Sequence, residues 1–172
     1  MTWCLTKAGK KFDMANPKAD QICIEDIAPA LSKQCRFNGH CDPFYSVAQH
    51  CLHVSELVPD EHKLTALLHD ATEAYIGDMV TPLKALIPDF KRIEDHLWNI
   101  ISDKYKVPLI LPWEVKRADL IALATEKRDL MPAHPEPWYC LRNIQPDQST
   151  LSPMTPAAAE TLFLTEFHRL VA

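Results

Sequence analysis

Apolar residues recur at helical spacing through most of the chain and predict a succession of amphipathic helices. Residues 22–34 and 43–58 each place their apolar positions on one face, and a Pro-Asp pair ends the second segment. The same spacing continues over residues 64–75 and stops at Gly77, a residue type that often follows the last helical turn. Each of these three segments is therefore predicted to be a helix with one buried face.

Further helices are predicted in the second half of the chain. Thr81-Pro82 is a typical start for a short helix, because threonine can cap it and proline lacks an N–H that would be unpaired there. Longer helices are expected over 89–104 and 113–131, and residues 132–154 read as a proline-rich loop. A final amphipathic helix is marked by Ala159, Leu162, Phe163, Phe167 and Leu170. Since no segment alternates as a strand would, the predicted fold class is all-α.

Composition and charge narrow the class of protein. With 172 residues, 47% of them hydrophobic and 24% charged, the chain is expected to form one globular domain over residues 1–172. A net charge of -5 argues against binding a nucleic-acid polymer but is compatible with a small anionic substrate. No apolar run is long enough for a membrane span, and the six cysteines form no CxxC pair. We therefore expect free thiols and a cytoplasmic protein, or one in the host cytoplasm if it is phage-encoded.

Polar residues that can ligate a metal lie beside apolar runs on three predicted helices. They are His50, His69, Asp70 and Asp119. Burying an imidazole or carboxylate without a partner is costly, and one divalent cation would satisfy all of them at once. The alternative is a buried His–Asp hydrogen-bond network. Glu73 follows His69 by one helical turn, where it could orient or deprotonate an attacking water, or be an exposed helix acid.

These residues and their surroundings resemble the HD-domain metal-dependent phosphohydrolases, whose motif is a helix histidine, a His-Asp doublet and a later aspartate. Within that superfamily the chain is most similar to the bacterial 5′-deoxynucleotidase branch, over about residues 35–130. The matching blocks are Arg36-Phe37, Ser46-Val47-Ala48-Gln49-His50, His69-Asp70-Ala71-Thr72-Glu73-Ala74, Gly77-Asp78-Met79-Val80-Thr81-Pro82-Leu83-Lys84 and Lys116-Arg117-Ala118-Asp119.

The resemblance implies an HD-type helical bundle, one divalent ion (Mn, Co, Zn, Fe or Mg) and a homodimer or higher homo-oligomer. The ion would be held by His50, His69, Asp70 and Asp119. His69, Asp70 and Glu73 would be catalytic, with Glu73 handling the attacking water. Arg36, Lys84 and Lys116 would contact phosphate, and Phe37 and Asp78 would face the deoxyribose. The position matched to Phe37 is usually tryptophan in that branch.

The resemblance thus implies a phosphohydrolase that acts on 2′-deoxynucleotides, a 5′-deoxynucleotidase that releases phosphate from deoxynucleoside monophosphates. A deoxynucleoside triphosphate triphosphohydrolase, acting for example on dATP as small phage-type members do, stays open because it uses the same four ligands. A binuclear phosphodiesterase would need two further histidines before the final aspartate, and only His96 lies there. From another class, a zinc-stabilised binding module could use His40, Cys41, His50 and Cys51, which lack the usual structural-zinc spacing.

Overall fold

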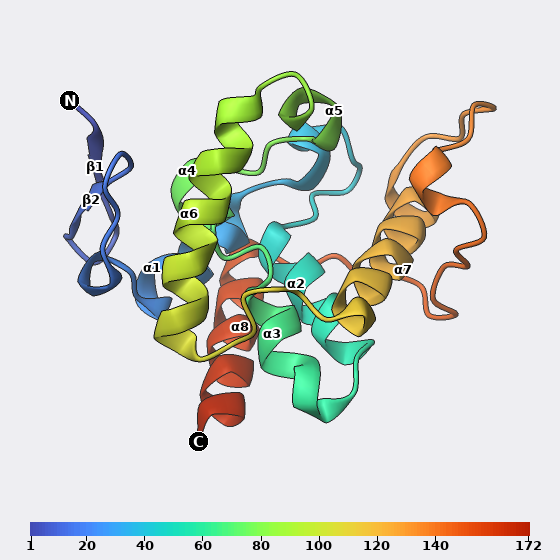
Figure 1. Ribbon diagram of the computed structural model, residues 1–172. Coiled ribbons are helices and arrows are strands. Elements are labelled where there is room, and N and C mark those ends of the chain that lie inside the picture. Colours follow the sequence, from blue (N-terminus) through green and yellow to red (C-terminus); the bar gives the residue numbers. More distant parts are fainter.

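The computed structural model describes all 172 residues, which fold mainly into helices (Figure 1). The helices are α1 (Ile24–Lys33), α2 (Val47–Glu56), α3 (Lys63–Leu68), α4 (Glu73–Ile76), α5 (Thr81–Lys84), α6 (Pro88–Tyr105), α7 (Trp113–Leu130) and α8 (Pro156–Val171). Short 3-10 turns occur at Ala19–Gln21, Arg36–Gly39, Asp60–His62 and Tyr139–Leu141. No helix combines the length and hydropathy needed to cross a bilayer. The prediction of a mainly helical domain is confirmed.

A small hairpin at the N-terminus departs from that prediction. β1 (Trp3–Leu5) pairs antiparallel with β2 (Lys11–Asp13), with Cys4 opposite Phe12. Each strand is three residues long, too short to show a clear alternation of apolar and polar positions, so the prediction that no segment forms a strand is wrong. Phe12 is fully buried and stacks on Tyr75 with 4.4 Å between ring centroids, which anchors the hairpin to the helical core.

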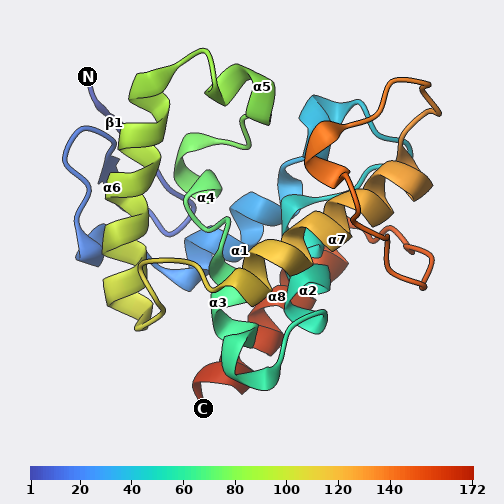
Figure 2. The same cartoon turned by 45° about the vertical axis from the view of Figure 1, so that its right-hand side comes forward.

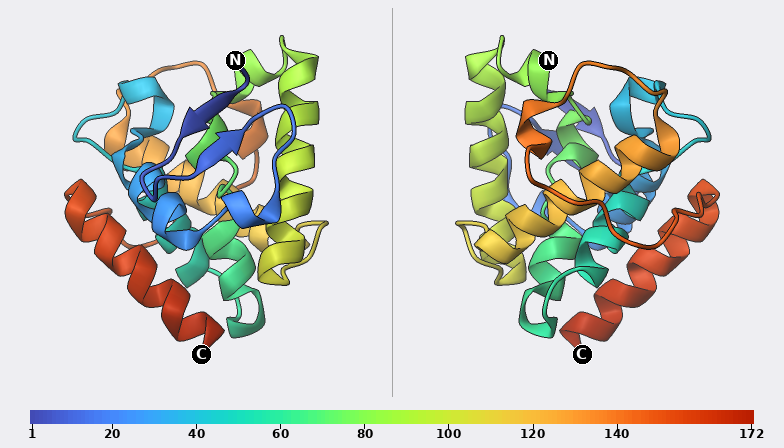
Figure 3. Two further views of the ribbon diagram at one scale, coloured as in Figure 1. Left: turned by 90° about the vertical axis from the view of Figure 1, so that its left-hand side faces the viewer. Right: turned by 90° about the vertical axis from the view of Figure 1, so that its right-hand side faces the viewer.

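Helix α2 lies at the centre of the fold and contacts α1, α3, α7 and α8. Figure 2 shows α7 crossing this central group, and Figure 3 shows α8 along one outer edge, with the two termini at opposite ends of the molecule. The largest core cluster joins side chains of α1, α2 and α3 to Leu97 of α6 and Phe163 of α8. The centre of the molecule therefore places the residues of α2 beside both α3 and α7.

The segment predicted as one helix up to Gly77 is divided into α3 and α4 by a tight turn over residues 69–72. The backbone N–H of Ala71 donates to the Leu68 carbonyl at 2.9 Å, and the N–H of Glu73 donates to the Asp70 carbonyl at 3.0 Å. These bonds span three residues rather than four, so the chain winds more tightly there than in an α-helix. Gly77 ends α4 with a φ of 85°, a left-handed value that favours glycine.

Candidate metal centre

The fold brings together the side chains of the predicted metal ligands. His50 lies on α2, His69 and Asp70 lie in the turn after α3, and Asp119 lies on α7. His50 Nε2 is 3.1 Å from Asp119 Oδ1 and 3.6 Å from Asp70 Oδ2. His69 Nε2 is 3.4 Å from Asp70 Oδ2 and 4.0 Å from Asp119 Oδ1. Ligand atoms about 2.1 Å from a common ion lie roughly 3.0 to 3.4 Å apart, so only a small contraction would close these four atoms around one divalent ion.

Both histidines use Nδ1 for contacts within the protein and direct Nε2 toward the other candidate ligand atoms. His50 Nδ1 lies 2.6 Å from Glu126 Oε1, and His69 Nδ1 lies 2.7 Å from the Ala66 carbonyl oxygen. Since a carboxylate and a carbonyl only accept, each Nδ1 is the donor. Both Nε2 atoms are buried: that of His69 has no hydrogen-bond partner, which costs about 1 to 3 kcal/mol for a polar group, and that of His50 lies 3.1 Å from Asp119 Oδ1. Either a divalent cation or a His–Asp hydrogen-bond network could satisfy these atoms.

Solvent exposure increases from one side of the site to the other among the four candidate ligand side chains. The exposed fraction of the side chain is 0% for His50, 5% for His69, 21% for Asp70 and 42% for Asp119. Asp119 was expected to point inward from an apolar helix, but its carboxylate reaches the surface because α7 packs on α2 through its alanine face, with Ala118 and Ala122 buried. The site is therefore open to solvent on the Asp119 side.

Glu73 is the first residue of α4 and is only 4% exposed, which excludes the interpretation that it is a surface acid. Its Oε1 lies 3.4 Å from Lys84 Nζ, and its Oε2 is buried without a partner. Burial, reinforced by the negative charge of Asp70, raises the pKa of Glu73 well above its ordinary value. Lys84 also donates to Glu94 at 2.7 Å, so the lysine is held between two carboxylates.

Arg36 lies in the turn before α2, and its side chain is 12% exposed. Its Nη2 and Nε donate to Glu126 Oε2 at 3.0 and 3.3 Å. Its Nη1 lies 3.9 Å from Asp70 Oδ2, on the side of the ligand cluster. Burial lowers the pKa of the guanidinium, but Glu126 and Asp70 outweigh it and raise that pKa further above its ordinary value, so Arg36 is a permanent cation beside the site.

Asp78 is half-buried near the same cluster and is positioned through its backbone. Its N–H donates to Gln34 Oε1 at 2.9 Å, and Gln34 Nε2 donates to the Glu73 carbonyl at 2.9 Å. Burial raises the pKa of Asp78, and the charge of Arg36 partly offsets this. Gln34, which sequence reasoning did not select, thus fixes the segment that carries Asp78 relative to Glu73.

Two of the predicted substrate contacts are less directly tied to the ligand cluster. The ring of Phe37 lies 5.3 Å from the Arg36 guanidinium and 6.1 Å from the Trp138 ring. The backbone of Phe37 has a left-handed φ of 57°. Lys116 lies exposed on α7, three residues before Asp119, and makes no side-chain hydrogen bond or ion pair. The structure therefore brings Arg36 and Lys84 into the ion-pair network of the site and leaves Lys116 outside it.

Glu126 is a buried acid in contact with two of the predicted site residues, His50 and Arg36, and sequence reasoning did not select it. It lies on α7, seven residues or about two helical turns after Asp119, and is fully buried. Burial raises its pKa, but Arg36 and His50 outweigh burial and lower that pKa below its ordinary value. The spacing from Asp119 places both acids on one face of the helix, and this spacing was the one signal that could have found Glu126.

The alternative zinc-binding residues do not converge. His40 is exposed, and Cys41 Sγ lies 3.7 Å from Cys35 Sγ. His50 groups with His69 and Asp119, and Cys51 groups with His69 and Asp70, but neither group includes His40 or Cys41. Burial raises the pKa of Cys51 well above its ordinary value, which keeps it a protonated thiol and a poor ligand. The interpretation as a structural zinc site is therefore corrected.

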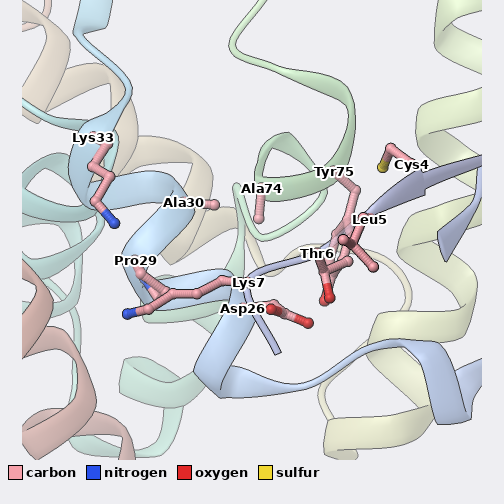
Figure 4. Close-up of a pocket in the computed structure, with 10 residues that line it drawn as sticks. All are labelled: Cys4, Leu5, Thr6, Lys7, Asp26, Pro29, Ala30, Lys33, Ala74 and Tyr75. Carbon is pink, nitrogen blue, oxygen red and sulfur yellow. The ribbon is translucent and has the colours of Figure 1, made fainter. Parts of the chain in front are cut away.

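A separate pocket of about 250 Å³ lies between the N-terminal hairpin and α1 (Figure 4). Tyr75 and Ala74 of α4 line one side of it, and Asp26 lies at its edge. Asp26 accepts from the Ala8 N–H at 2.6 Å and from Cys23 Sγ at 3.2 Å, so this carboxylate is already satisfied within the protein. None of the predicted site residues lines this pocket.

Binding of a divalent ion is expected to release a proton from His50. Burial and the charge of Arg36 lower the pKa of His50 in the metal-free protein, but Glu126 and Asp119 outweigh them and raise it to about 10. Because the folded-state pKa lies above the unfolded value of about 6.5, protonation stabilises the metal-free fold below about pH 6.5, and this contribution is lost as pH rises toward 10. An ion that takes Nε2 must displace that proton.

Titration calorimetry with Zn²⁺ at about pH 7.5, in buffers of different ionisation enthalpy, measures this release. We expect an enthalpy that depends on the buffer and an affinity that increases with pH. An enthalpy independent of the buffer would contradict a protonated His50 in the metal-free protein.

The fold and the site together define a mainly helical protein whose His and Asp side chains could hold a divalent ion. No protein-family model matches the chain. The chain is 44% identical over 171 residues to the uncharacterized protein YfdR of Escherichia coli K12, covering 99% of this chain and 96% of that protein. It is 38% identical over 126 residues to the uncharacterized protein RCAP_rcc00048 of Rhodobacter capsulatus, covering 67% of this chain and 64% of that protein. The chain belongs to the family of proteins related to YfdR.

Proposed function

We propose that this protein is a metal-dependent phosphohydrolase of the HD-domain type, acting as a 5′-deoxynucleotidase on deoxynucleoside monophosphates. The observation that carries the proposal is the convergence of the buried Nε2 atoms of His50 and His69 on carboxylate oxygens of Asp70 and Asp119, at 3.1 to 4.0 Å. The resemblance to HD-domain enzymes in the sequence blocks around these residues supports the same assignment. Arg36, Lys84 and Glu73 add the charges and the acid-base group that a phosphoester hydrolase needs.

Each of these residues has a role in the proposed reaction. His50, His69, Asp70 and Asp119 would hold a divalent ion, which would supply Lewis-acid chemistry by lowering the pKa of water and polarising a phosphoryl oxygen. Glu73 accepts the proton of the attacking water, whose oxygen forms a bond to phosphorus as the bond from phosphorus to the 5′ oxygen breaks. The leaving 5′ oxygen takes a proton from solvent water, Glu73 returns its proton to solvent, and the nucleoside departs. Arg36 and Lys84 stabilise the negative charge that develops on the phosphoryl oxygens.

The charge around the site favours a monophosphate over a triphosphate. Both cations of the site are already paired, Arg36 with Glu126 and Lys84 with Glu94 and Glu73. A triphosphate brings additional negative charge that needs further cations, and the exposed Lys116 and Arg117 of α7 are the nearest along the chain to Asp119. The triphosphohydrolase alternative therefore depends on these two surface residues.

The test is turnover by the purified protein with Mn²⁺, Co²⁺ or Zn²⁺, and with EDTA, on deoxy- and ribonucleoside mono- and triphosphates, with products separated by ion exchange. Inorganic phosphate from deoxynucleoside monophosphates, abolished by EDTA, is the expected result. Intact triphosphate together with free deoxynucleoside would instead establish the triphosphohydrolase. Absence of any metal-dependent product from all nucleotides would overturn both assignments.

Alanine variants of Lys84 and Lys116 test further whether the substrate is a monophosphate or a triphosphate. Replacing Lys84 by alanine is expected to raise KM for a deoxynucleoside monophosphate about tenfold, because a charge-assisted contact to phosphate is lost. Replacing Lys116 by alanine should change that KM by less than about threefold, since an exposed lysine outside the network contributes little. Steady-state kinetics of the two variants measures the difference. A larger effect of Lys116→Ala than of Lys84→Ala would favour a longer phosphate chain that reaches the surface.

A further inference from the structure

Glu126 contacts the two sides of the site with two different oxygens. Its Oε1 accepts from His50 Nδ1 at 2.6 Å, and its Oε2 accepts from Arg36 Nη2 at 3.0 Å and Nε at 3.3 Å. The Glu126 side chain is fully buried, so water does not reach it to replace either hydrogen-bond partner. One carboxylate thereby joins a predicted metal ligand to a predicted phosphate contact.

Each of these contacts leaves one polar atom of the partner directed to the ligand cluster. With Nδ1 committed to Glu126, His50 has Nε2 beside Asp119 and Asp70. With Nε and Nη2 committed to Glu126, Arg36 has Nη1 at 3.9 Å from Asp70 Oδ2. Glu126 therefore fixes the orientation of both the His50 imidazole and the Arg36 guanidinium, on the side of each group that faces away from the ligand cluster.

An ionised carboxylate is the group that fits this position. It accepts at both oxygens, whereas the amide of glutamine accepts at its oxygen and donates at its nitrogen. In a Glu126→Gln variant, the amide NH₂ would face either the Nδ1–H of His50 or the N–H groups of Arg36, and two donors would meet in a buried site. The variant can therefore satisfy only one of the two partners at a time.

We propose that Glu126 is a positioning residue that orients His50 for the divalent ion and Arg36 for the phosphoryl group at once. The proposal rests on the proposed function for the identity of the two ligands, an ion and a phosphate. Glu126, which lies outside the HD-type motif, would thereby couple metal binding to phosphate binding. Removing the carboxylate should weaken both, whereas removing the arginine should weaken phosphate binding alone.

The experiment compares metal and phosphate affinity in the wild type, Glu126→Gln, Glu126→Asp and Arg36→Ala. Calorimetry with Zn²⁺ alone, and then with inorganic phosphate on the zinc-loaded protein, gives both affinities without any turnover. We expect Glu126→Gln to lower zinc affinity about 10- to 100-fold, as loss of the partner behind a ligating histidine does. Phosphate affinity should fall about tenfold in both Glu126→Gln and Arg36→Ala, with zinc affinity nearly unchanged in Arg36→Ala.

Glu114→Gln is the matched control, because it makes the same chemical change on the same helix at a half-buried residue whose one ion-pair partner is His62. Its two affinities should stay within about twofold of the wild type. Nitrogen NMR of the His50 ring in the zinc-loaded protein reports the tautomer directly. Zinc on Nε2 keeps the ring proton on Nδ1, so zinc-bound Nε2 with Nδ1–H should dominate in the wild type and in Glu126→Asp, where the carboxylate remains, whereas Glu126→Gln should lose the zinc-bound Nε2 signal of His50 at the same zinc concentration. A role confined to packing would leave this signal unchanged in all variants.

Circular dichroism and thermal melting show whether each variant is folded. If Glu126→Gln does not fold, Glu126→Asp tests the proposal: its shorter side chain draws the carboxylate back from both partners, so zinc and phosphate affinity should fall together, and wild-type values of both would overturn the positioning role. Wild-type affinities and an unchanged zinc-bound Nε2 signal of His50 in a folded Glu126→Gln protein would overturn the positioning role and leave the proposed function intact. A wild type that binds no divalent ion would overturn the proposed function and this inference together. A protein that binds zinc through Glu126-dependent His50 but hydrolyses no nucleotide would overturn the proposed function alone.

Discussion

Replacing Asp70 by alanine is expected to remove the divalent ion and to lower phosphohydrolase turnover at least about 1000-fold. In the proposed reaction a divalent ion would contribute several kcal/mol of transition-state stabilisation, and about 1.4 kcal/mol corresponds to a factor of ten in rate. Asp70 Oδ2 is the atom that lies near both histidine Nε2 atoms and near Arg36 Nη1. Its loss leaves two nitrogens without the shared carboxylate that gathers them around the ion.

The measurement pairs metal content by mass spectrometry with the rate of phosphate release. Asp95→Ala is the control, because Asp95 is an exposed acid of α6 whose partner is Lys91, away from the ligand cluster. This control should bind metal and turn over as the wild type does. Full activity in Asp70→Ala, with the protein folded, would contradict the assignment of Asp70 as a ligand.

Replacing Glu73 by glutamine is expected to lower kcat about 100- to 10,000-fold while metal affinity stays within a few-fold of the wild type. General-base catalysis contributes a factor of this size, and an amide cannot accept the proton of the attacking water. Glu73 is not among the residues that group around the candidate ion, and its Oε2 is buried without a partner. The variant therefore separates the proton acceptor from the metal ligands.

Steady-state kinetics and zinc calorimetry on the same preparation measure both quantities. The exposed Glu61, replaced by glutamine in the same way, is the control and should leave kcat and affinity unchanged. Equal loss of metal affinity and of kcat in Glu73→Gln would make Glu73 a ligand rather than a base. Wild-type kcat would remove it from the mechanism.

The helices and their bounds were largely predictable because their signals are local. Ser46 caps α2 by accepting the Gln49 N–H at 3.1 Å, and Gly77 ends α4 in a left-handed conformation. Periodic burial was equally readable, as in Phe163 and Phe167 of α8. The hairpin was not readable, because its stability comes from Phe12 packing on Tyr75, a contact between residues far apart in the chain.

The candidate ligands could be selected from the sequence because each is a polar residue beside an apolar run. The break between α3 and α4 at His69 could not be predicted. The apolar residues keep helical spacing there, while the backbone hydrogen bonds join residues three apart instead of four. The role of Glu126 could not be predicted either. Its partners lie 76 and 90 residues away, and only the packing of α7 on α2 brings them together.

The most direct test of the metal centre is anomalous diffraction from crystals grown with Mn²⁺ or Zn²⁺, recorded above and below the absorption edge of the metal. We predict one anomalous peak within about 2.0 to 2.2 Å of His50 Nε2, His69 Nε2 and one oxygen each of Asp70 and Asp119. A peak at the cysteine thiols instead, or none between these four side chains at saturating metal, would contradict the account.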